Sequence, residues 1–267
     1  MRILFWNTHN NEDINEVLSE LIIENNISIV VLAEYKANAD KLFAILSMQG
    51  INMSSYITTG CERINIFGVL SNVEPATQTH YASMQVINKK DILCCIHLPS
   101  KIYGNSEAMQ EIVTRQIISD IRSLEMKLNT ENTIVVGDFN SNPYEPGCVN
   151  ATLFHGIPVY NEAKRKSRII AEQEFHMFYN PMWNFLGDAI EPYGTYYHGG
   201  SGAENTYWHI YDQVIIRPAL RERFIDSNLK ILTETSSRYL INRKGHPNTE
   251  ISDHLPIMFE IKEDNYG

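Results

Sequence analysis

Polar side chains that can bind a metal or move a proton stand at the ends of five short apolar runs. They are Asn7 in RILFWNTHN, Glu34 in ISIVVLAEY, His97 in ILCCIHLPS, Asp138 and Asn140 in TIVVGDFNSNP, and Asp253 and His254 in ISDHLPIMFEI. Catalytic groups collect where strands give way to loops, so five such ends in register would gather carboxylates, amides and imidazoles at one cleft. These groups suit metal-assisted hydrolysis of phosphoesters.

The ordered motifs resemble those of the endonuclease/exonuclease/phosphatase superfamily, which includes DNase I-like nucleases, abasic-site endonucleases, sphingomyelinases and inositol-polyphosphate phosphatases. GDFN and SDH are its most specific signatures. Each string is weak by itself, but their order and separation make the pair strong. The resemblance runs from Ile3 to Ile261. It implies an α/β fold with two stacked mixed β-sheets flanked by helices, a four-layer α-β-β-α sandwich.

Three of the motif residues are expected to bind a metal. A carboxylate directly after VVLA would be costly inside a sheet, so Glu34 is expected at a strand end, where its oxygens suit Mg²⁺ or Mn²⁺. The resemblance makes Glu34 the principal ligand, with Asn7 and Asp253 completing the set directly or through water. Mg²⁺ is the expected cofactor and Mn²⁺ the alternative. The structural alternatives are a surface glutamate and an ordinary Asn turn.

The remaining motif residues are expected to act on the substrate or its attacking water. Asp138 and Asn140 are two residues apart, so both can face the same side of an extended turn. The resemblance has Asp138 orient or deprotonate water and Asn140 bond the phosphoryl oxygen or water on the metal; an Asx turn is the alternative for Asn140. It makes His254 the catalytic histidine and Asp212 the aspartate that orients it. Gln213 departs from the usual Asp-Tyr pair.

His97 resembles the histidine that contacts the scissile phosphate, although a lone histidine after an apolar run is often structural. Glu62, just before the strand INIFGVL, is its candidate partner in a second dyad, and a surface glutamate beside Arg63 is the alternative. The other histidines show no zinc-site spacing, and no nucleotide-binding fingerprint is present. We therefore expect no nucleotide cofactor.

The elements that position these groups follow from hydrophobic periodicity. Asn10 or Asn11 is the expected cap of a helix with apolar residues from Ile14 to Ile22, and a short helix lies around 42–46. A long helix with an apolar face from Met109 to Leu128 has Asn105 or Ser106 as its expected cap. Residues 141–206 are expected to form long loops with short helices. Besides the first apolar run, the predicted strands cover 27–33, 64–70, 84–87, 92–98, 133–136, 210–216, 229–233 and 256–261.

Length and composition favour one domain over residues 1–267. The 30.7 kDa chain has 43% hydrophobic residues, but no stretch approaches the roughly 18 apolar residues of a membrane span, and no apolar signal region precedes RILFWN. We therefore predict a cytoplasmic protein. Its four cysteines are expected to be reduced: Cys94 and Cys95 are adjacent on a strand and point to opposite faces, while Cys61 and Cys148 are far apart in sequence.

The net charge of −10 argues against a protein that coats nucleic acid through a large basic surface, but not against a nuclease with a cationic cleft. Two basic islands are candidates for a rim that tracks phosphates, and solvated loops are the alternative. Their members are Lys164, Arg165, Lys166 and Arg168 in the first island, and Arg238, Arg243 and Lys244 in the second. Aromatic residues that could stack on bases, or else belong to the core, are Trp183, Tyr196, Tyr197 and Trp208.

The leading functional prediction is a Mg²⁺-dependent phosphodiesterase, specifically a nuclease acting on DNA in preference to RNA. The alternative enzyme is a phosphatase acting on a phosphoinositide or another small phosphoester. An inactive binding module is disfavoured because every expected acid, amide and imidazole is present. The oligomeric state and the choice between endo and exo cleavage are left open.

Overall fold

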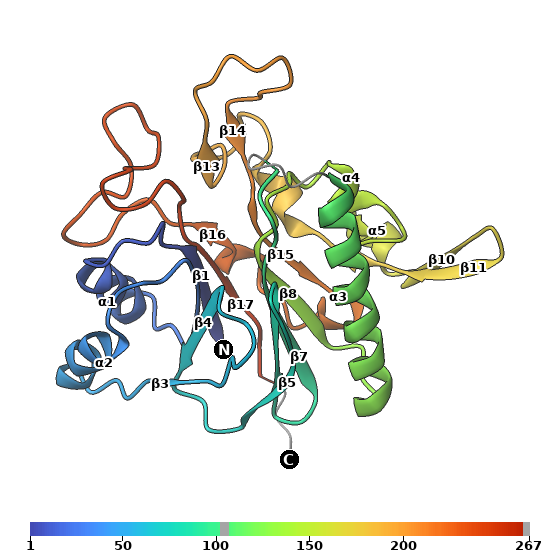
Figure 1. The fold of residues 1–267 in the computed structure, drawn as a ribbon, viewed down its shortest axis with the longest axis horizontal. Helices are drawn as coiled ribbons and strands as arrows, with labels where there is room; N and C mark the ends of the chain where they lie inside the picture. Colours follow the sequence, from blue (N-terminus) through green and yellow to red (C-terminus); the bar gives the residue numbers. More distant parts are fainter. Residues whose placement is uncertain (102–106, 264–267) are drawn as a thin grey trace.

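Two mixed β-sheets stack face to face in the computed structural model, which describes residues 1–101 and 107–263 (Figure 1). The six-stranded sheet runs in the order β16 (Lys230–Ile231), β17 (Ile257–Glu260), β1 (Arg2–Asn7), β2 (Ile29–Ala33), β4 (Ile64–Gly68) and β3 (Ser54–Ser55). The seven-stranded sheet runs in the order β5 (Val73–Thr79), β6 (Ala82–Ile87), β7 (Asp91–His97), β8 (Thr133–Asp138), β15 (Asp212–Ile216), β12 (Phe178–Tyr179) and β9 (Gly156–Ile157). Parallel pairs β1/β2 and β7/β8 occur among antiparallel ones, so both sheets are mixed.

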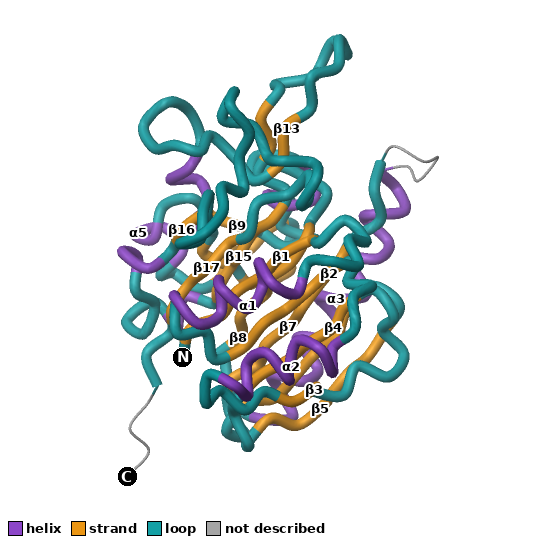
Figure 2. Tube along the Cα trace, turned by 90° about the vertical axis from the view of Figure 1, so that its left-hand side faces the viewer, coloured by secondary structure: helices purple, strands orange, loops and turns teal. Residues whose placement is uncertain are grey.

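Helices cover the outer face of each sheet. α1 (Asn15–Glu24) and α2 (Ala39–Met48) lie over the six-stranded sheet, while α3 (Glu107–Leu128) lies along the seven-stranded sheet (Figures 1 and 2). The predicted four-layer α-β-β-α sandwich is therefore confirmed. The shorter helices are α4 (Pro146–Val149), α5 (Tyr160–Ala163), η1 (Pro181–Phe185), η2 (Pro218–Leu220) and η3 (Asp226–Asn228). None of the helices in the described ranges combines the length and apolar character needed to cross a membrane.

Alternating side chains of the seven-stranded sheet build two separate core clusters. Cys95 and Val136 pack in the cluster that includes the six-stranded sheet, whereas Cys94 and Val135 pack in the cluster that includes α3. The opposite orientation of the two adjacent cysteines is thus confirmed, and all four cysteines are free and buried. Each interior strand is apolar on both faces because both faces are covered.

The first helix begins later than its expected cap. α1 starts at Asn15, and the residue before it, Ile14, makes no side-chain cap bond. Asn10, which was expected to cap this helix, instead donates from Nδ2 to Glu34 Oε2 at 2.8 Å. The cap prediction was wrong because an amide that can cap a helix can equally bond a carboxylate brought close by the fold.

At the N-terminal end of α3, the buried face is not the one that the apolar residues predicted. Met109 and Ile112 are 37% and 65% exposed, while Gln110 and Thr114 are buried in their place. Gln110 is buried because its amide is bonded: Nε2 donates to the Pro99 carbonyl at 2.7 Å. The expected caps Asn105 and Ser106 lie outside the described residues.

Several strands were not predicted, since they are short or half-exposed. β5 is an edge strand that contains Pro75, which explains its weak pattern. Two hairpins interrupt the region expected to hold loops and short helices. They are β10 (Ser167–Ile170) with β11 (Gln173–His176), and β13 (Tyr196–Tyr197) with β14 (Trp208–His209). The second hairpin proves important for the site.

Candidate active site

Three predicted site residues occupy one row across the seven-stranded sheet. Asp138, the last residue of β8, is paired in register with His97 on β7 and with Asp212 on β15. Directly paired residues present their side chains on the same face, so the two neighbours flank the Asp138 carboxylate. The sequence motifs that end β7 and β8 and begin β15 therefore meet at one edge of the sheet, as predicted.

The glycine of GDFN allows these strands to approach. Gly137 is paired with Ile96, and a Cβ atom at position 137 would lie 1.9 Å from the Ile96 carbonyl oxygen. Such a contact is far inside van der Waals distance with backbone, so any larger residue would separate β7 from β8. Separation at this point would move His97 away from Asp138.

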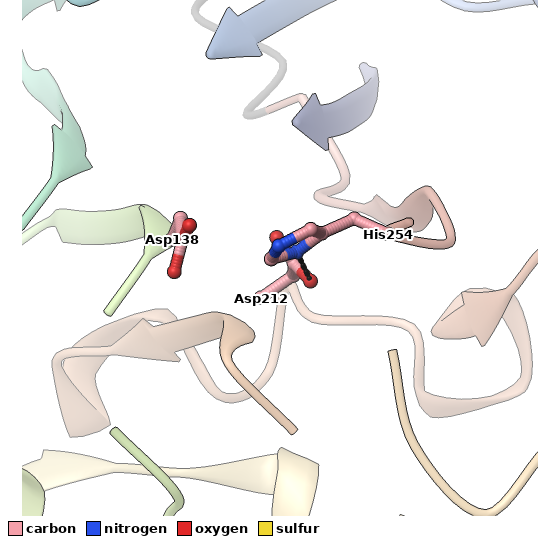
Figure 3. Close-up of side chains that lie close together, drawn as sticks. All are labelled: Asp138, Asp212 and His254. Atoms are coloured by element: carbon pink, nitrogen blue, oxygen red, sulfur yellow. Dashed lines mark hydrogen bonds and ion pairs between the residues drawn. The ribbon is translucent and has the colours of Figure 1, made fainter. Parts of the chain in front are cut away.

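Asp212 and His254 form the predicted dyad. Asp212 Oδ2 lies 2.8 Å from His254 Nδ1, and both residues are buried (Figure 3). Burial acts to lower the pKa of His254, but the charge of Asp212, its hydrogen bond and the nearby Asp138 carboxylate outweigh burial and raise that pKa. The ring is therefore held as an imidazolium whose Nδ1–H donates to Asp212.

Asp138 is oriented by two donors. Asn7 Nδ2 donates to its Oδ2 at 3.1 Å, and the backbone N–H of Asn140 donates to its Oδ1 at 2.8 Å. Burial raises the pKa of Asp138, with His254 pulling in the opposite direction. Asn140 adopts φ 46°, and its Nδ2 donates to the Leu98 carbonyl at 3.0 Å. The Asx turn is therefore made by the Asp138 side chain, while the Asn140 amide nitrogen bonds the backbone of Leu98.

Hydrogen bonds fix the SDH loop, residues 252–254, against the end of β1. Ser252 Oγ donates to the Asn7 carbonyl at 2.7 Å and accepts from the His254 N–H at 3.1 Å. Trp6 Nε1 donates to the His254 carbonyl at 2.8 Å. These buried bonds hold the loop that carries Asp253 and His254 from two sides, which restricts the position of the His254 ring.

Glu34 follows β2 directly, in the left-handed region at φ 52°. Its carbonyl accepts from the N–H of Asn10 at 3.0 Å and from Thr8 Oγ1 at 3.0 Å, and these contacts fix the backbone turn. Its carboxylate reaches the same cluster, because Oε1 lies 3.7 Å from His97 Nε2. The side chain is 30% exposed, so the carboxylate is accessible from outside.

His97 has different neighbours from those expected. Its Nε2 faces Glu34 and Asp138, at 3.7 Å from an oxygen of each. Its Nδ1 has no hydrogen-bond partner among the described residues, so the predicted dyad with Glu62 is wrong. Burial, with smaller effects from nearby positive groups such as Arg63, lowers the pKa of His97 to about 3 and keeps the ring neutral.

The predicted metal ligands supply hard oxygen atoms, which fit Mg²⁺ or Mn²⁺. One of them, Asp253 Oδ1, is buried and accepts no hydrogen bond from the described residues, with His9 Nδ1 at 3.1 Å as its ion-pair neighbour. An unpaired carboxylate oxygen is costly to bury, and a cation would satisfy it. Glu34, Asn7 and Asp253 therefore stay the predicted ligands.

A second group has atoms close enough to hold a metal. One ligand atom each from Asp138, Asp212 and His254 lies within 4.8 Å of the others (Figure 3). In this group His254 Nδ1 is already bonded to Asp212 Oδ2, so a metal here would have to replace that bond or bind His254 through Nε2.

The β13/β14 hairpin supports the dyad, and the sequence motifs did not reveal this role. Tyr196 forms a β-bridge with His254, and their rings lie 4.9 Å apart. The preceding residue, Thr195, is fully buried; its Oγ1 accepts from the Asp212 N–H at 3.2 Å. Thr195 also accepts the Leu255 N–H at 2.8 Å through its carbonyl. The only sequence signal was the aromatic run GTYYHGG, which does not identify Thr195.

The two basic islands lie in different environments. The first follows α5 and runs into β10, and in it Arg165 pairs with Glu162 and Lys166 with Glu131. Figure 1 shows this hairpin projecting beside α3, apart from the β13/β14 hairpin that contacts His254. In the second island, Lys244 lines a cavity next to Trp208.

No protein-family model matches the chain, and no curated protein matches it. Solved structures do match. An AP endonuclease from Archaeoglobus fulgidus aligns at a TM-score of 0.59 and 13% identity, covering 98% of this chain and 100% of that one. The 3′ phosphatase NExo from Neisseria, bound to a product DNA hairpin, aligns at 0.54 and 18% with the same coverages. The human Nocturnin catalytic domain aligns at 0.56 and 13%, covering 97% and 93%.

These similarities span nearly the whole of each chain. Together with the order of layers, they show that the protein shares the fold of these structures, the four-layer sandwich that its motifs predicted.

Proposed function

We propose that the protein is a metal-dependent phosphodiesterase that cleaves DNA in preference to RNA. The observation that carries the proposal is the meeting of the Asp212–His254 pair with Asp138, held by Asn7, at the strand ends of the two stacked sheets. Two of the similar structures support a nucleic-acid substrate: one is an AP endonuclease, and the other is an enzyme bound to a DNA hairpin. A cytoplasmic location and a single domain over 1–267 stay predictions.

Each residue has a role that its contacts suit. Asp212 orients the His254 ring and maintains its positive charge, so the ring can stabilise negative charge that develops on a phosphoryl oxygen. Asp138 has its pKa raised by burial, so its carboxylate is suited to take a proton from the attacking water. Asn7 and the Asn140 N–H fix the direction of that carboxylate.

Glu34, with Asn7 and Asp253, would hold the Mg²⁺ or Mn²⁺ ion. When bound, the ion would polarise the phosphoryl oxygen and offset the negative charge of the surrounding carboxylates. The neutral His97 ring, next to Glu34 and Asp138, provides an uncharged polar group that can bond a phosphate oxygen without competing with a cation.

Phosphatase activity is the second candidate, and one similar structure is described as a 3′ phosphatase. The two activities are separated by measuring plasmid nicking and phosphate release together, with Mg²⁺, with Mn²⁺ and with EDTA. We expect nicking that requires a divalent ion and is lost in His254→Ala. Phosphate release from DNA 3′ ends without nicking would support the phosphatase instead. Absence of both reactions on DNA and RNA would reject the proposed function.

A further inference from the structure

A cavity of about 530 Å³ opens beside the β13/β14 hairpin, on the segment that carries the second basic island. Its walls include Tyr193, Trp208 and His246, and Lys244 and Glu191 stand among them. This volume falls in the range of ligand pockets, which are roughly 300–1,000 Å³. Nothing in the roles assigned above uses this cavity.

The aromatic rings of the cavity stand at steep angles to one another. The Tyr193 ring lies 6.1 Å from Trp208 at 81°, and the His246 ring lies 5.8 Å from Trp208 at 77°. The His246 ring is fixed in turn by a face-to-face stack on Tyr197, at 3.5 Å and 13°. Because these rings contact one another edge to face, they line the cavity without closing it. A flat group can therefore enter the cavity and stack on a ring.

The charges of the cavity suit a phosphate next to that flat group. Lys244 is exposed, and within the described ranges its ammonium has no hydrogen-bond or ion-pair partner. Glu191, the carboxylate of the cavity lining, accepts at Oε1 from the Tyr193 hydroxyl at 2.7 Å and keeps its negative charge, so a phosphate would bind on the Lys244 side of the cavity. A cation beside aromatic rings is the combination that binds a nucleotide, with its base stacked and its phosphate paired.

The hairpin connects this cavity to the dyad. Tyr196 bridges to His254, while the next residue, Tyr197, stacks on His246 at the cavity. Successive strand residues point to opposite faces, so the cavity and the dyad lie on opposite sides of the hairpin. A substrate strand that reaches from the dyad to the cavity therefore has to pass around the hairpin.

We infer that this cavity binds an unpaired nucleobase of the substrate strand, away from the scissile phosphate and across the hairpin from the dyad, with Lys244 on a flanking phosphate. The inference rests on the proposed function and adds a substrate class to it. A base that stacks in a cavity cannot remain in a duplex, so the substrate is single-stranded on this side of the cleavage site. DNA ends with overhangs, gaps and single strands meet this requirement, and intact duplex does not.

The test measures binding of single-stranded DNA oligonucleotides of increasing length to the inactive His254→Ala protein by fluorescence anisotropy. We expect the affinity for the oligonucleotide to increase abruptly at the length at which the strand reaches the cavity. Trp208→Leu should reduce that step roughly 10-fold, the scale of one base stacked on an aromatic ring. Trp183→Leu is the matched control, because Trp183 is a half-buried tryptophan on η1 that does not line the cavity.

Two further readouts are specific to the cavity. Lys244→Gln should reduce the slope of log binding constant against log salt concentration by about 1, the effect of losing one phosphate contact. Lys164→Gln in the first island should leave that slope unchanged. Intrinsic fluorescence should be quenched by long oligonucleotides in the parent and in Trp183→Leu, but not in Trp208→Leu. Unchanged melting temperatures show that these variants remain folded.

The outcomes separate this inference from the proposed function. If the parent binds oligonucleotides but shows no step with length, or if both tryptophan variants lose affinity equally, the cavity is not a base subsite. If intact duplex binds as tightly as single strands in every variant, the inference is also rejected. If no oligonucleotide binds the parent at any length, the proposed function itself fails.

Discussion

Asp212 illustrates how one buried charge organises the candidate site. It is fully buried, its Oδ2 bonds the His254 ring, and its backbone N–H is held by Thr195. A buried carboxylate is costly without a cationic partner, so Asp212 and His254 stabilise each other's charged forms. The two residues should therefore behave as one catalytic unit.

Substitutions of this pair should show strong non-additivity. His254→Ala removes the acting group, and Asp212→Asn leaves the ring with altered tautomer and charge. Each should reduce kcat by on the order of 10² or more, while the double variant is scarcely slower than His254→Ala. Steady-state kinetics on all three proteins check this, with binding of Mg²⁺ as a control that should be unaffected. Losses that multiply would show independent action.

Glu34→Gln should weaken metal binding while retaining the fold. The change keeps the size of the side chain and its bond to Asn10 but removes the charge that a hard cation prefers. Calorimetric titration with Mg²⁺ should show a clear loss of affinity, together with loss of activity. Glu62→Gln is the matched control, as an exposed glutamate without contact to His97. Unchanged Mg²⁺ binding in Glu34→Gln would remove Glu34 from the ligand set.

His155 should make stability fall in mild acid. It is fully buried; its Nδ1 donates to the His176 carbonyl, and its Nε2 has no partner in the described ranges. Burial, aided by Arg168, lowers its pKa to about 4. Because this folded-state pKa lies below the unfolded one, the unfolded chain takes up the proton first and stability is lost as pH falls below about 6.5.

The expected contribution of His155 is a loss of about 1 kcal/mol between pH 7 and pH 5.5. Urea unfolding at the two pH values measures the loss, and His155→Asn should show a smaller one. Asparagine is the suitable replacement because position 155 has φ 50°, which asparagine tolerates. An equal pH dependence in both proteins would exclude His155 as the origin.

At the scale of elements, short hairpins do as much for the site as the long strands. β13 and β14 have two residues each, yet the hairpin bonds both Asp212 and the SDH loop through Thr195 and Tyr196. Gly194 permits this packing, because a Cβ there would lie 2.5 Å from the His209 carbonyl oxygen. The hairpin thus joins the end of the seven-stranded sheet to the loop before β17.

Thr195 should act as a positioning residue. Thr195→Val keeps the shape but removes the oxygen that accepts from the Asp212 N–H, leaving a buried donor unpaired. We expect kcat to fall roughly 10-fold with little change in KM, whereas Thr195→Ser retains the oxygen and most of the activity. Thermal melting distinguishes lost orientation from unfolding. Equal kcat values in the serine and valine variants would show that the hydroxyl has no positioning role.

Strands, layers and motif order were predictable because they depend on local patterns. Apolar runs identified β2, β4, β7 and β8, and the motifs at their ends were brought together by pairing that follows from the sandwich. Polar contacts across the chain were not predictable. Periodicity predicts that Gln110 is exposed, and its burial is explained by bonds to the carbonyls of Pro99 and Asn140 and from the Ser141 hydroxyl. The bonds of Asn10 to Glu34 and of Thr195 to Asp212 likewise join separate parts of the chain, so local patterns do not predict them.

At the scale of the whole molecule, each sheet draws strands from both ends of the chain. β17 pairs with β1, and β15 pairs with β8. The termini of the fold are consequently tied together, with the N-terminal ammonium donating to the Ile261 carbonyl at 2.9 Å. The site likewise takes Asn7, Glu34 and Asp138 from the part of the chain before the β10/β11 hairpin, and Asp212 and His254 from the part after it.

The β10/β11 hairpin lies between these two parts of the chain and is joined to neither large sheet. Its turn residues Ala171 and Glu172 have φ of 47° and 64°, and Ile169 is 77% exposed. Opening the chain in this turn should therefore break no sheet. Co-expressed pieces 1–171 and 172–267 are expected to co-purify through a tag on one piece and to nick plasmid only together. Pieces divided within β8 should not reassemble.

Pieces opened at the hairpin that fail to associate would show that the covalent turn is needed for the sheets to pair. Successful reassembly would give a split protein that is active only when its two pieces associate. Because neither piece holds both Asp138 and His254, cleavage of DNA would report the encounter of any two proteins to which the pieces were fused.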